Sequence, residues 1–337
     1  MKKLLVLFLL LTLLSGCQHS ELKNQAPVNA MYIDYSQNLY TVKLITQDIG
    51  EENENLSLPV RCYDAAAPTV QQAIVRAQAQ ASKRLFFRQC QILLLGQGIY
   101  EKAPFELCKQ MHTSIANAPN VEVYGLYGNM NLTQAEKLIQ AMSLFRSNCA
   151  KSYLYEFADA EKGILPLVCI GANKINFLGL AVYSKQADPF FLNGAAAEFC
   201  AGLLGKKQEL IFVNNDNEDV LRYQITSPKT TYTVTQNSEN PTLQIRLYGK
   251  IDYLLLSNAT NLSDSRKKRK EISRSINRAA EDEIQNLIKL SLKQGVDLFD
   301  WRFYCSNACK SNDIQALDTK QLFEQFRIDV SAQFHIV

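Results

Sequence analysis

The stretch Gln91-Ile92-Leu93-Leu94-Leu95-Gly96 decides the fold of the N-terminal half of this 337-residue chain. It is an unbroken apolar run with the length of an interior β-strand. A helix is expected just before it, because Thr69 can act as the N-cap with Gln72 at the reciprocal position of a capping box. Apolar residues then follow at helical spacing as far as Leu85. A helix that leads into a buried strand is typical of α/β proteins.

The alternation of strands and helices continues on both sides of this stretch. Before it, residues 31–35 and 39–45 are rich in β-branched and aromatic side chains, so we expect two paired strands. After it, the periodicity predicts a helix over 99–111, a strand over 121–127 and a helix over 131–145. The pattern indicates an α/β domain that extends to about residue 170.

The rest of the chain is expected to form further mixed structure. Strands are predicted at 165–170, 177–183, 230–234, 243–248 and 326–336, and helices at 193–204 and 265–293. We therefore expect an α+β or mixed α/β protein with two to three mixed-sheet domains. These are an N-terminal α/β domain at 29–172, a central domain at 173–222, and a C-terminal domain at 223–337 that contains the long helix 265–293. One face of that helix is apolar from Ile272 to Leu287 and should pack on the C-terminal sheet.

Residues 1–17 have the pattern of a bacterial lipoprotein signal. Lys2 and Lys3 precede an apolar run from Leu4 to Leu14, which at about 1.5 Å per residue spans only half of a bilayer core of roughly 30 Å. Leu14-Ser15-Gly16-Cys17 is then a lipobox. We expect a signal peptide at 1–16, with diacylglycerol on the sulfur of Cys17 and an acyl chain such as palmitate on its new amino group. The alternative is a plain secretory signal with an incidental cysteine.

The polar residues 17–28 are expected to be a short lipidated tether. A flexible tether of this length reaches about 18 Å, so the folded body should stay close to the headgroups, on the extracytoplasmic face. No later stretch has 18 uninterrupted apolar residues, so the lipid is the only membrane attachment that we expect. Removal of residues 1–16 takes Lys2 and Lys3 from the 36 basic residues and leaves 34 against 33 acidic ones, so the mature chain is close to neutral. No global charge favours nucleic acid as a partner.

Cysteines offer one local pairing. Most of the cysteines other than Cys17 lie within apolar or periodic segments, where a thiol behaves as a small buried hydrophobe. Only Cys305 and Cys309 have loop-like surroundings and a spacing short enough to close locally, so they are the candidate disulfide. A zinc site would need two further ligands, and the three histidines are scattered through the chain, so we expect no metal.

Few residue patterns point to catalysis. The histidines are His19, His112 and His335, none of them near another, and there is no phosphate-binding glycine loop or Gly-x-Ser-x-Gly turn. Gly96-Gln97-Gly98 is too short for such a loop. Cys108 and His112 are four residues apart on a predicted helix, but a packed helix explains them better than a catalytic pair. We expect no enzymatic activity and no cofactor.

The strongest charge feature is the run Arg266-Lys267-Lys268-Arg269-Lys270 at the start of the long helix. Five cations there oppose the helix macrodipole at a cost of about 0.3–1 kcal/mol each, so something should offset them. Candidates are Glu271 or the acidic run at 281–283, anionic headgroups, or an acidic partner surface. A simple solvated face is the alternative. The run is therefore a candidate membrane or partner contact.

Taken in order, these segments resemble the Ger(x)C family, the lipoprotein C-subunits of spore nutrient-germinant receptors. The resemblance rests on the order and spacing of several short motifs. They are the lipobox 14–17, Met31-Tyr32-Ile33-Asp34-Tyr35, Pro68 to Ile74, Ser82 to Phe87 running into Gln91 to Gly96, Gly179 to Tyr183, Leu203 to Lys206, and Leu292-Lys293-Gln294 before Asp297-Leu298-Phe299 and Trp301. The chain departs from the family at Asn117-Ala118-Pro119-Asn120 and at Asp300 to Cys305, where partner contacts could differ.

The resemblance implies an elongated, non-enzymatic lipoprotein on the outer face of the spore inner membrane. It implies a multi-spanning A-subunit and a transporter-like B-subunit as partners, and a requirement for the protein in germination. Two other classes stay open. A free-standing extracytoplasmic ligand-binding lipoprotein would have a deep pocket between two similar lobes. An exported enzyme would use Cys305 and Cys309 for thiol chemistry.

Overall fold

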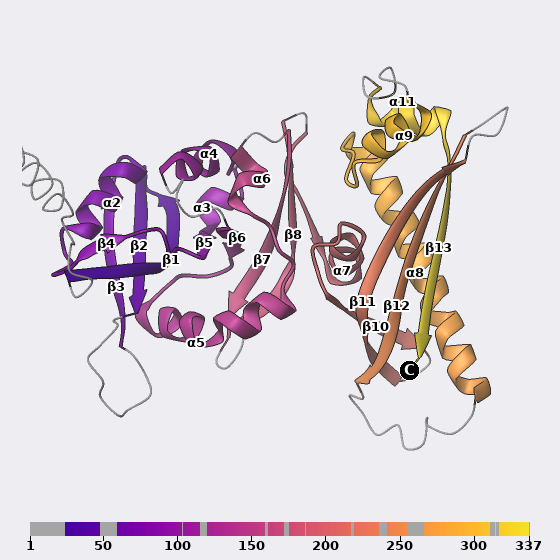
Figure 1. Ribbon diagram of the computed structural model, residues 1–337, viewed down its shortest axis with the longest axis horizontal. Coiled ribbons are helices and arrows are strands. Elements are labelled where there is room, and N and C mark those ends of the chain that lie inside the picture. Colours follow the sequence, from indigo (N-terminus) through magenta and orange to yellow (C-terminus); the bar gives the residue numbers. More distant parts are fainter. Residues whose placement is uncertain are drawn as a thin grey trace, which may run out of the picture.

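The computed structural model describes residues 24–47, 59–102, 104–114, 120–158, 161–171, 175–185, 187–216, 219–235, 241–254, 266–310, 314 and 317–336. Their strands form two sheets, one toward each end of an elongated body, with helix α7 (Gly194–Leu203) between them (Figure 1). The predicted mixed α/β architecture is confirmed.

The first sheet is mixed and is centred on the predicted interior strand. That strand is β5 (Ile92–Leu95), whose four residues are all buried. The other strands are β1 (Gln25–Ser36), β2 (Leu39–Gln47), β3 (Val60–Ala67), β4 (Arg84–Phe86), β6 (Glu122–Leu126), β7 (Lys162–Ile170), β8 (Ile175–Ser184) and β9 (Phe190–Asn193). Their order is β3-β2-β1-β5-β6-β7-β8-β9, with β4 paired to β1. The central four strands, β1, β5, β6 and β7, are parallel, and the outer pairs in that order are antiparallel.

Helices cover both faces of the first sheet, as the alternation of side chains in its central strand requires. Leu93 and Leu95 pack in one core with α2 (Val70–Gln78), α3 (Gln97–Tyr100), α4 (Phe105–Ser114) and α6 (Leu154–Ala158). Ile92 and Leu94 pack in the opposite core with α5 (Leu132–Asn148). Because both faces of β5 are covered, its sequence is apolar throughout.

Local signals fix two helix starts in this region. The Oγ1 of Thr69 accepts the N–H of Gln72 at 3.3 Å, so Thr69 is the N-cap of α2 as predicted. The single helix expected over 99–111 is wrong, because the chain forms α3 and α4 instead. Pro104 separates them: it has no N–H to continue α3, whereas its carbonyl accepts the N–H of Cys108 in α4 at 2.8 Å.

The second sheet has the order β10-β11-β12-β13 and carries the long helix. Its strands are β10 (Glu209–Asp216), β11 (Asp219–Thr235), β12 (Thr242–Leu254) and β13 (Arg327–Ile336), of which only β13 pairs in parallel, with β12. Helix α8 (Arg266–Gln294) buries Ile276, Ala280, Ile284 and Leu287 in the same core as the inner residues of this sheet. The predicted apolar face of the long helix is therefore confirmed.

Helix α7 connects the two sheets through one continuous core. Every residue from Ala197 to Leu203 is buried, and a helix without a polar face must be surrounded by protein. It contacts β8 and β9 of the first sheet and β10, β11 and α8 of the second half. Leu180 of β8 and Leu247 of β12 belong to the same cluster of buried residues. The two sheets are thus packed together and not merely linked.

Two domain boundaries expected from the sequence fall inside paired structure. Residue 172 lies between β7 and β8, which form an antiparallel pair, and the boundary after residue 222 lies within β11, which pairs with β12. The change from one sheet to the other occurs between β9 and β10 instead. The residues around 172 suit a hairpin turn as well as a break between domains, because both use glycine and asparagine.

Candidate functional site

The predicted site residues lie in different parts of the chain. Cys17, the predicted lipidation site, lies outside the described residues, as do the rest of the signal and the tether up to residue 23. The expected tether extended to residue 28, which is wrong, because residues 25–28 belong to β1 and three of them are buried. No helix within the described ranges is long and apolar enough to cross a bilayer. The basic run begins α8 at Arg266, as the sequence predicted, and Arg269 and Lys270 are exposed there.

Cys305 and Cys309 lie in a helix and not in a loop, which corrects the expectation from the sequence. The helix is α9 (Trp301–Cys309). Its first turn is stabilised by the buried carboxylate of Asp297, which accepts the N–H groups of Trp301 and Arg302 at 3.0 Å each. Both cysteines are free thiols, so the candidate disulfide is not formed in the structure. Burial raises the pKa of the Cys305 thiol to about 12, which disfavours the nucleophilic thiolate.

The ligand position usual for an open α/β sheet is filled by the protein itself. That position is the carboxyl end of β1 and β5, because the chain leaves β1 toward β2 on one side and returns to β5 on the other. There the Oδ1 of Asp34 accepts the N–H groups of Tyr35 at 2.8 Å and Gly98 at 3.0 Å. Burial and the Asp34 charge raise the pKa of the neighbouring Tyr32 hydroxyl, which donates to Asp34.

The two glycines beside Asp34 explain why the chain can approach so closely. A Cβ on Gly98 would lie 1.8 Å from the carbonyl oxygen of Tyr35, and one on Gly96 would lie 2.3 Å from the Cγ of Asp34. The spacing Gly96-Gln97-Gly98, which is too short for a phosphate-binding loop, allows this contact. It marks an internal hydrogen bond where a nucleotide-binding protein would place a phosphate.

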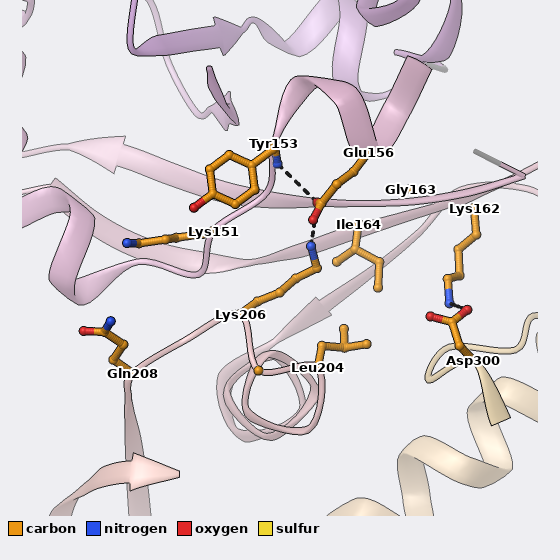
Figure 2. Close-up of a pocket in the computed structure, with 11 residues that line it drawn as sticks. Lys151, Tyr153, Glu156, Lys162, Gly163, Ile164, Leu204, Lys206, Gln208 and Asp300 are labelled. Carbon is orange, nitrogen blue, oxygen red and sulfur yellow. Dashed lines mark hydrogen bonds and ion pairs between the residues drawn. The ribbon is translucent and has the colours of Figure 1, made fainter. Parts of the chain in front are cut away.

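An open cavity of about 470 Å³ between the two halves of the molecule is the candidate functional site (Figure 2). Its walls come from α6 and the residues before it, the start of β7, the segment after α7, and the residue before α9. The lining residues are Lys151, Tyr153, Glu156, Lys162, Gly163, Ile164, Leu204, Gly205, Lys206, Gln208 and Asp300.

Lys162 joins the two halves at one side of this cavity. Its ammonium donates to the Oδ1 of Asp300 at 2.7 Å (Figure 2). It also donates to the carbonyl oxygens of Asp297 at 2.8 Å and Leu298 at 3.1 Å. All three N–H bonds of the ammonium are therefore used. Lys162 begins β7, whereas its three partners precede α9, so the contact spans more than 130 residues of sequence.

Lys206 makes a second bridge across the cavity. Its ammonium lies 2.6 Å from the Oε2 of Glu156 in α6, and the same oxygen accepts the N–H of Tyr153 at 3.2 Å (Figure 2). The carbonyl oxygen of Lys206 accepts the N–H of Lys151 at 2.8 Å. The segment after α7 is thus held to the first half by both its backbone and its side chain.

The chemistry of the cavity is that of a polar contact surface. Neither cysteine nor histidine is among its lining residues, and two of its lysines are paired with its two carboxylates. Across the described part of the chain, no group of three or more histidine, cysteine, aspartate or glutamate side chains could hold a metal ion. Sequence reasoning missed the pairs Lys162–Asp300 and Lys206–Glu156, because the two members of each pair lie far apart in the chain and no local pattern connects them.

Comparisons with known proteins identify the family. Residues 18–143 match the sequence model described as "Spore germination protein N-terminal domain". Residues 179–337 match the one described as "Spore germination B3/ GerAC like, C-terminal". The chain belongs to the Ger(x)C family. The resemblance found in the sequence is therefore confirmed, and this Ger(x)C protein is a spore germination protein of the C-subunit class.

One solved structure shares the fold of this Ger(x)C protein. It is described as "Crystal Structure of the GerBC protein", with a TM-score of 0.52 and 12% sequence identity. The match covers 91% of this chain and 96% of that chain, so it extends over both sheets. At this identity the likeness concerns the fold alone. A comparison with curated proteins finds no significant match.

Proposed function

We propose that this Ger(x)C protein is the lipid-anchored C-subunit of a nutrient germinant receptor, and that it works by binding membrane-embedded A- and B-subunits. The observation that carries the proposal is the match of both halves of the chain to spore germination families. The lipobox at residues 14–17 supports an anchor on the sulfur of Cys17. Together they favour a position on the outer face of the spore inner membrane.

The distribution of reactive groups supports binding to partners over catalysis. His112 and His335, the two histidines within the described ranges, are exposed and belong to different halves of the molecule. Burial raises the pKa of the Cys90 and Cys200 thiols to about 12 in each case, so neither is poised as a nucleophile. The cavity between the halves uses its own ion pairs to hold its walls together.

The fold gives less support to a free-standing ligand-binding lipoprotein. Such a protein would enclose its ligand between two similar lobes. Here one half is a mixed nine-stranded sheet covered by helices on both faces, and the other is a four-stranded sheet with one long helix. The cavity between them is open and is bridged by ion pairs at Lys162 and Lys206. An exported thiol enzyme is disfavoured by the raised pKa of Cys305.

The proposal is tested by the variant Cys17→Ala in spores. Each acyl methylene contributes about 0.8 kcal/mol to membrane binding, so loss of the acceptor thiol should release the protein from the membrane fraction. We expect the variant to lose the germination response to nutrients and to stop co-purifying with the A- and B-subunits. Cys309→Ala is the matched control, because this half-buried thiol should be dispensable for both. A soluble Cys17→Ala protein with a full nutrient response would contradict the proposal.

A further inference from the structure

The basic start of α8 is the charge feature that the proposed function leaves unexplained. From Arg266 to Arg278 the helix carries seven basic residues and one acidic residue, Glu271. Basic residues in the first turn of a helix oppose the macrodipole, and like charges four residues apart repel each other, so this arrangement disfavours the helix unless a counter-charge is present. An anionic ligand that binds these side chains is the simplest explanation for the basic run.

Three of these basic side chains form a row on the outer face of α8. Lys270, Arg274 and Arg278 follow each other at intervals of four residues, which places them on the same side of the helix, and all three are exposed. We call them the α8 stripe. None of the three has an ion pair or hydrogen bond with another described residue. The neighbouring Ile276 and Ala280 face the opposite way, into the core.

The acidic residues that the sequence offered as counter-charges, Glu271 and the run 281–283, form no ion pair with the α8 stripe in the described structure. The carboxylate of Glu281 accepts the backbone N–H of Ala332 in β13 at 2.9 Å. Glu283 is partly buried, and Asp282 is exposed without forming an ion pair with Arg278 in the described structure. Within the part of the chain that the structure describes, the α8 stripe therefore forms no ion pair, and its three cations outnumber the two exposed acidic residues beside them, Glu271 and Asp282.

We propose that the α8 stripe binds the anionic headgroups of a lipid bilayer. Clusters of Lys and Arg on an amphipathic helix are typical of such contacts. The apolar face of α8 is already used in the core, so the contact is electrostatic and needs no insertion into the bilayer. The inference rests on the proposed function in one respect: the tether keeps the body close to a bilayer, where headgroups are the nearest extended anionic surface.

This contact would set how the protein lies on the membrane. The tether leads into β1 in the first sheet, whereas α8 lies at the other end of the elongated body (Figure 1). A body that touches the bilayer through both ends has its long axis along the membrane. A body held by the tether alone could stand upright, with α8 away from the headgroups.

The first test measures vesicle binding by the chain without residues 1–17, which contains every described residue but carries no lipid. We expect it to bind vesicles with 30% phosphatidylglycerol and not vesicles of phosphatidylcholine alone, with affinity that falls as salt rises. The variant Lys270→Gln/Arg274→Gln/Arg278→Gln should bind about 100-fold more weakly, because each basic residue near the surface contributes about fivefold. The matched control is Lys289→Gln/Lys293→Gln/Lys320→Gln, which removes the same charge from exposed positions and should bind as the parent does.

A second measurement avoids any change of sequence. Acetylation of exposed amines, followed by mass spectrometry, should show Lys270 protected by phosphatidylglycerol vesicles while Lys289 and Lys293 on the same helix stay reactive. Equal binding by the two triple variants, equal protection of the three lysines, or no binding to anionic vesicles at low salt would overturn the proposal. The last result would point to an acidic protein partner. Because no lipid is attached, these outcomes are independent of Cys17 and of the germination assay.

Discussion

The ammonium of Lys207 lies 2.6 Å from both carboxylate oxygens of Glu198, in an ion pair that is buried beside the junction of the two sheets. The same carboxylate accepts the N–H of Ile211 at 3.1 Å, and the ammonium lies 4.6 Å from the ring centre of Phe177. Glu198 belongs to α7, Ile211 to β10 and Phe177 to β8. One pair of charges therefore connects the central helix to a strand of each sheet.

Removing one member of this pair should be strongly destabilising. Lys207→Met leaves the Glu198 carboxylate buried without its counter-ion, and such changes cost about 3–5 kcal/mol in the free energy of unfolding. Urea denaturation followed by circular dichroism measures it. Lys206→Met, at the neighbouring and more exposed pair with Glu156, should cost less than half as much. Similar losses in the two variants would show that the Lys207 pair is not truly desolvated.

The bridge made by Lys162 should stabilise the junction between the halves. Lys162→Met removes the donor to the carbonyl oxygens of Asp297 and Leu298, and lost hydrogen bonds to a charged group are each worth about 1.5–3 kcal/mol. We expect a clear fall in the free energy of unfolding and faster amide exchange just before α9. Lys185→Met, at an exposed lysine just after β8, is the control. Unchanged exchange before α9 would mean that the bridge contributes nothing in solution.

The contact between Asp34 and Gly98 should tolerate little change. Gly98→Ala would place a Cβ 1.8 Å from the carbonyl oxygen of Tyr35, so the backbone of β1 or α3 must move. Overpacking of this kind costs about 1–3 kcal/mol or more, which thermal denaturation would detect. Gln97→Ala, at an exposed position one residue earlier, should leave the melting temperature within a degree or two. A stable Gly98→Ala protein would show that the β1 to α3 contact is looser than described.

Alkaline pH should destabilise the protein through its buried thiols. Burial raises the pKa of Cys90, Cys149, Cys200 and Cys305 from 9.0 to about 12. Above pH 9 the unfolded chain releases these protons while the folded chain keeps them, so stability is full below pH 9 and is lost as the pH rises toward 12. Each such group contributes a slope of up to about 1.4 kcal/mol per pH unit.

Urea unfolding at pH 7.5, 9.5 and 10.5 measures this loss. The variant Cys90→Ala removes one titrating thiol, and its stability should therefore fall less steeply over the same range than that of the parent. Stability that stays constant up to pH 10.5 would contradict the burial of these thiols.

Much of the fold follows from signals that are local in the sequence. Three elements could be predicted because each is specified by residues close together in the chain, and the structure confirms all three. They are the strand of the apolar run 92–95, the helix capped by Thr69, and α8 with its one-sided apolar face. The α9 helix was missed because its N-cap residue, Asp300, makes no side-chain cap bond, and the first N–H groups are bound instead by the buried carboxylate of Asp297, four residues before the helix begins. Local propensity does not reveal a cap that depends on tertiary placement.

The candidate site was beyond sequence reasoning for a different reason. Its walls are held together by the ion pairs Lys162–Asp300 and Lys206–Glu156. Both pairs depend on how α7 packs between the sheets, because that packing sets the distance between the two halves. An isolated lysine or glutamate is ordinary on any surface. The family, in contrast, could be inferred, because it depends on the order of motifs such as 31–35, 82–87 and 179–183 along the chain.

The burial of α7 on all sides has a mechanical consequence. A body made of two sheets would usually bend where they meet, but here that place is filled by close-packed side chains, including a glycine, Gly202, whose Cβ would collide with Leu210. Bending would open voids in the core, and close-packed interiors resist this. If a neighbouring subunit displaces one end, the two halves should therefore move together as one rigid body, so that the other end tilts.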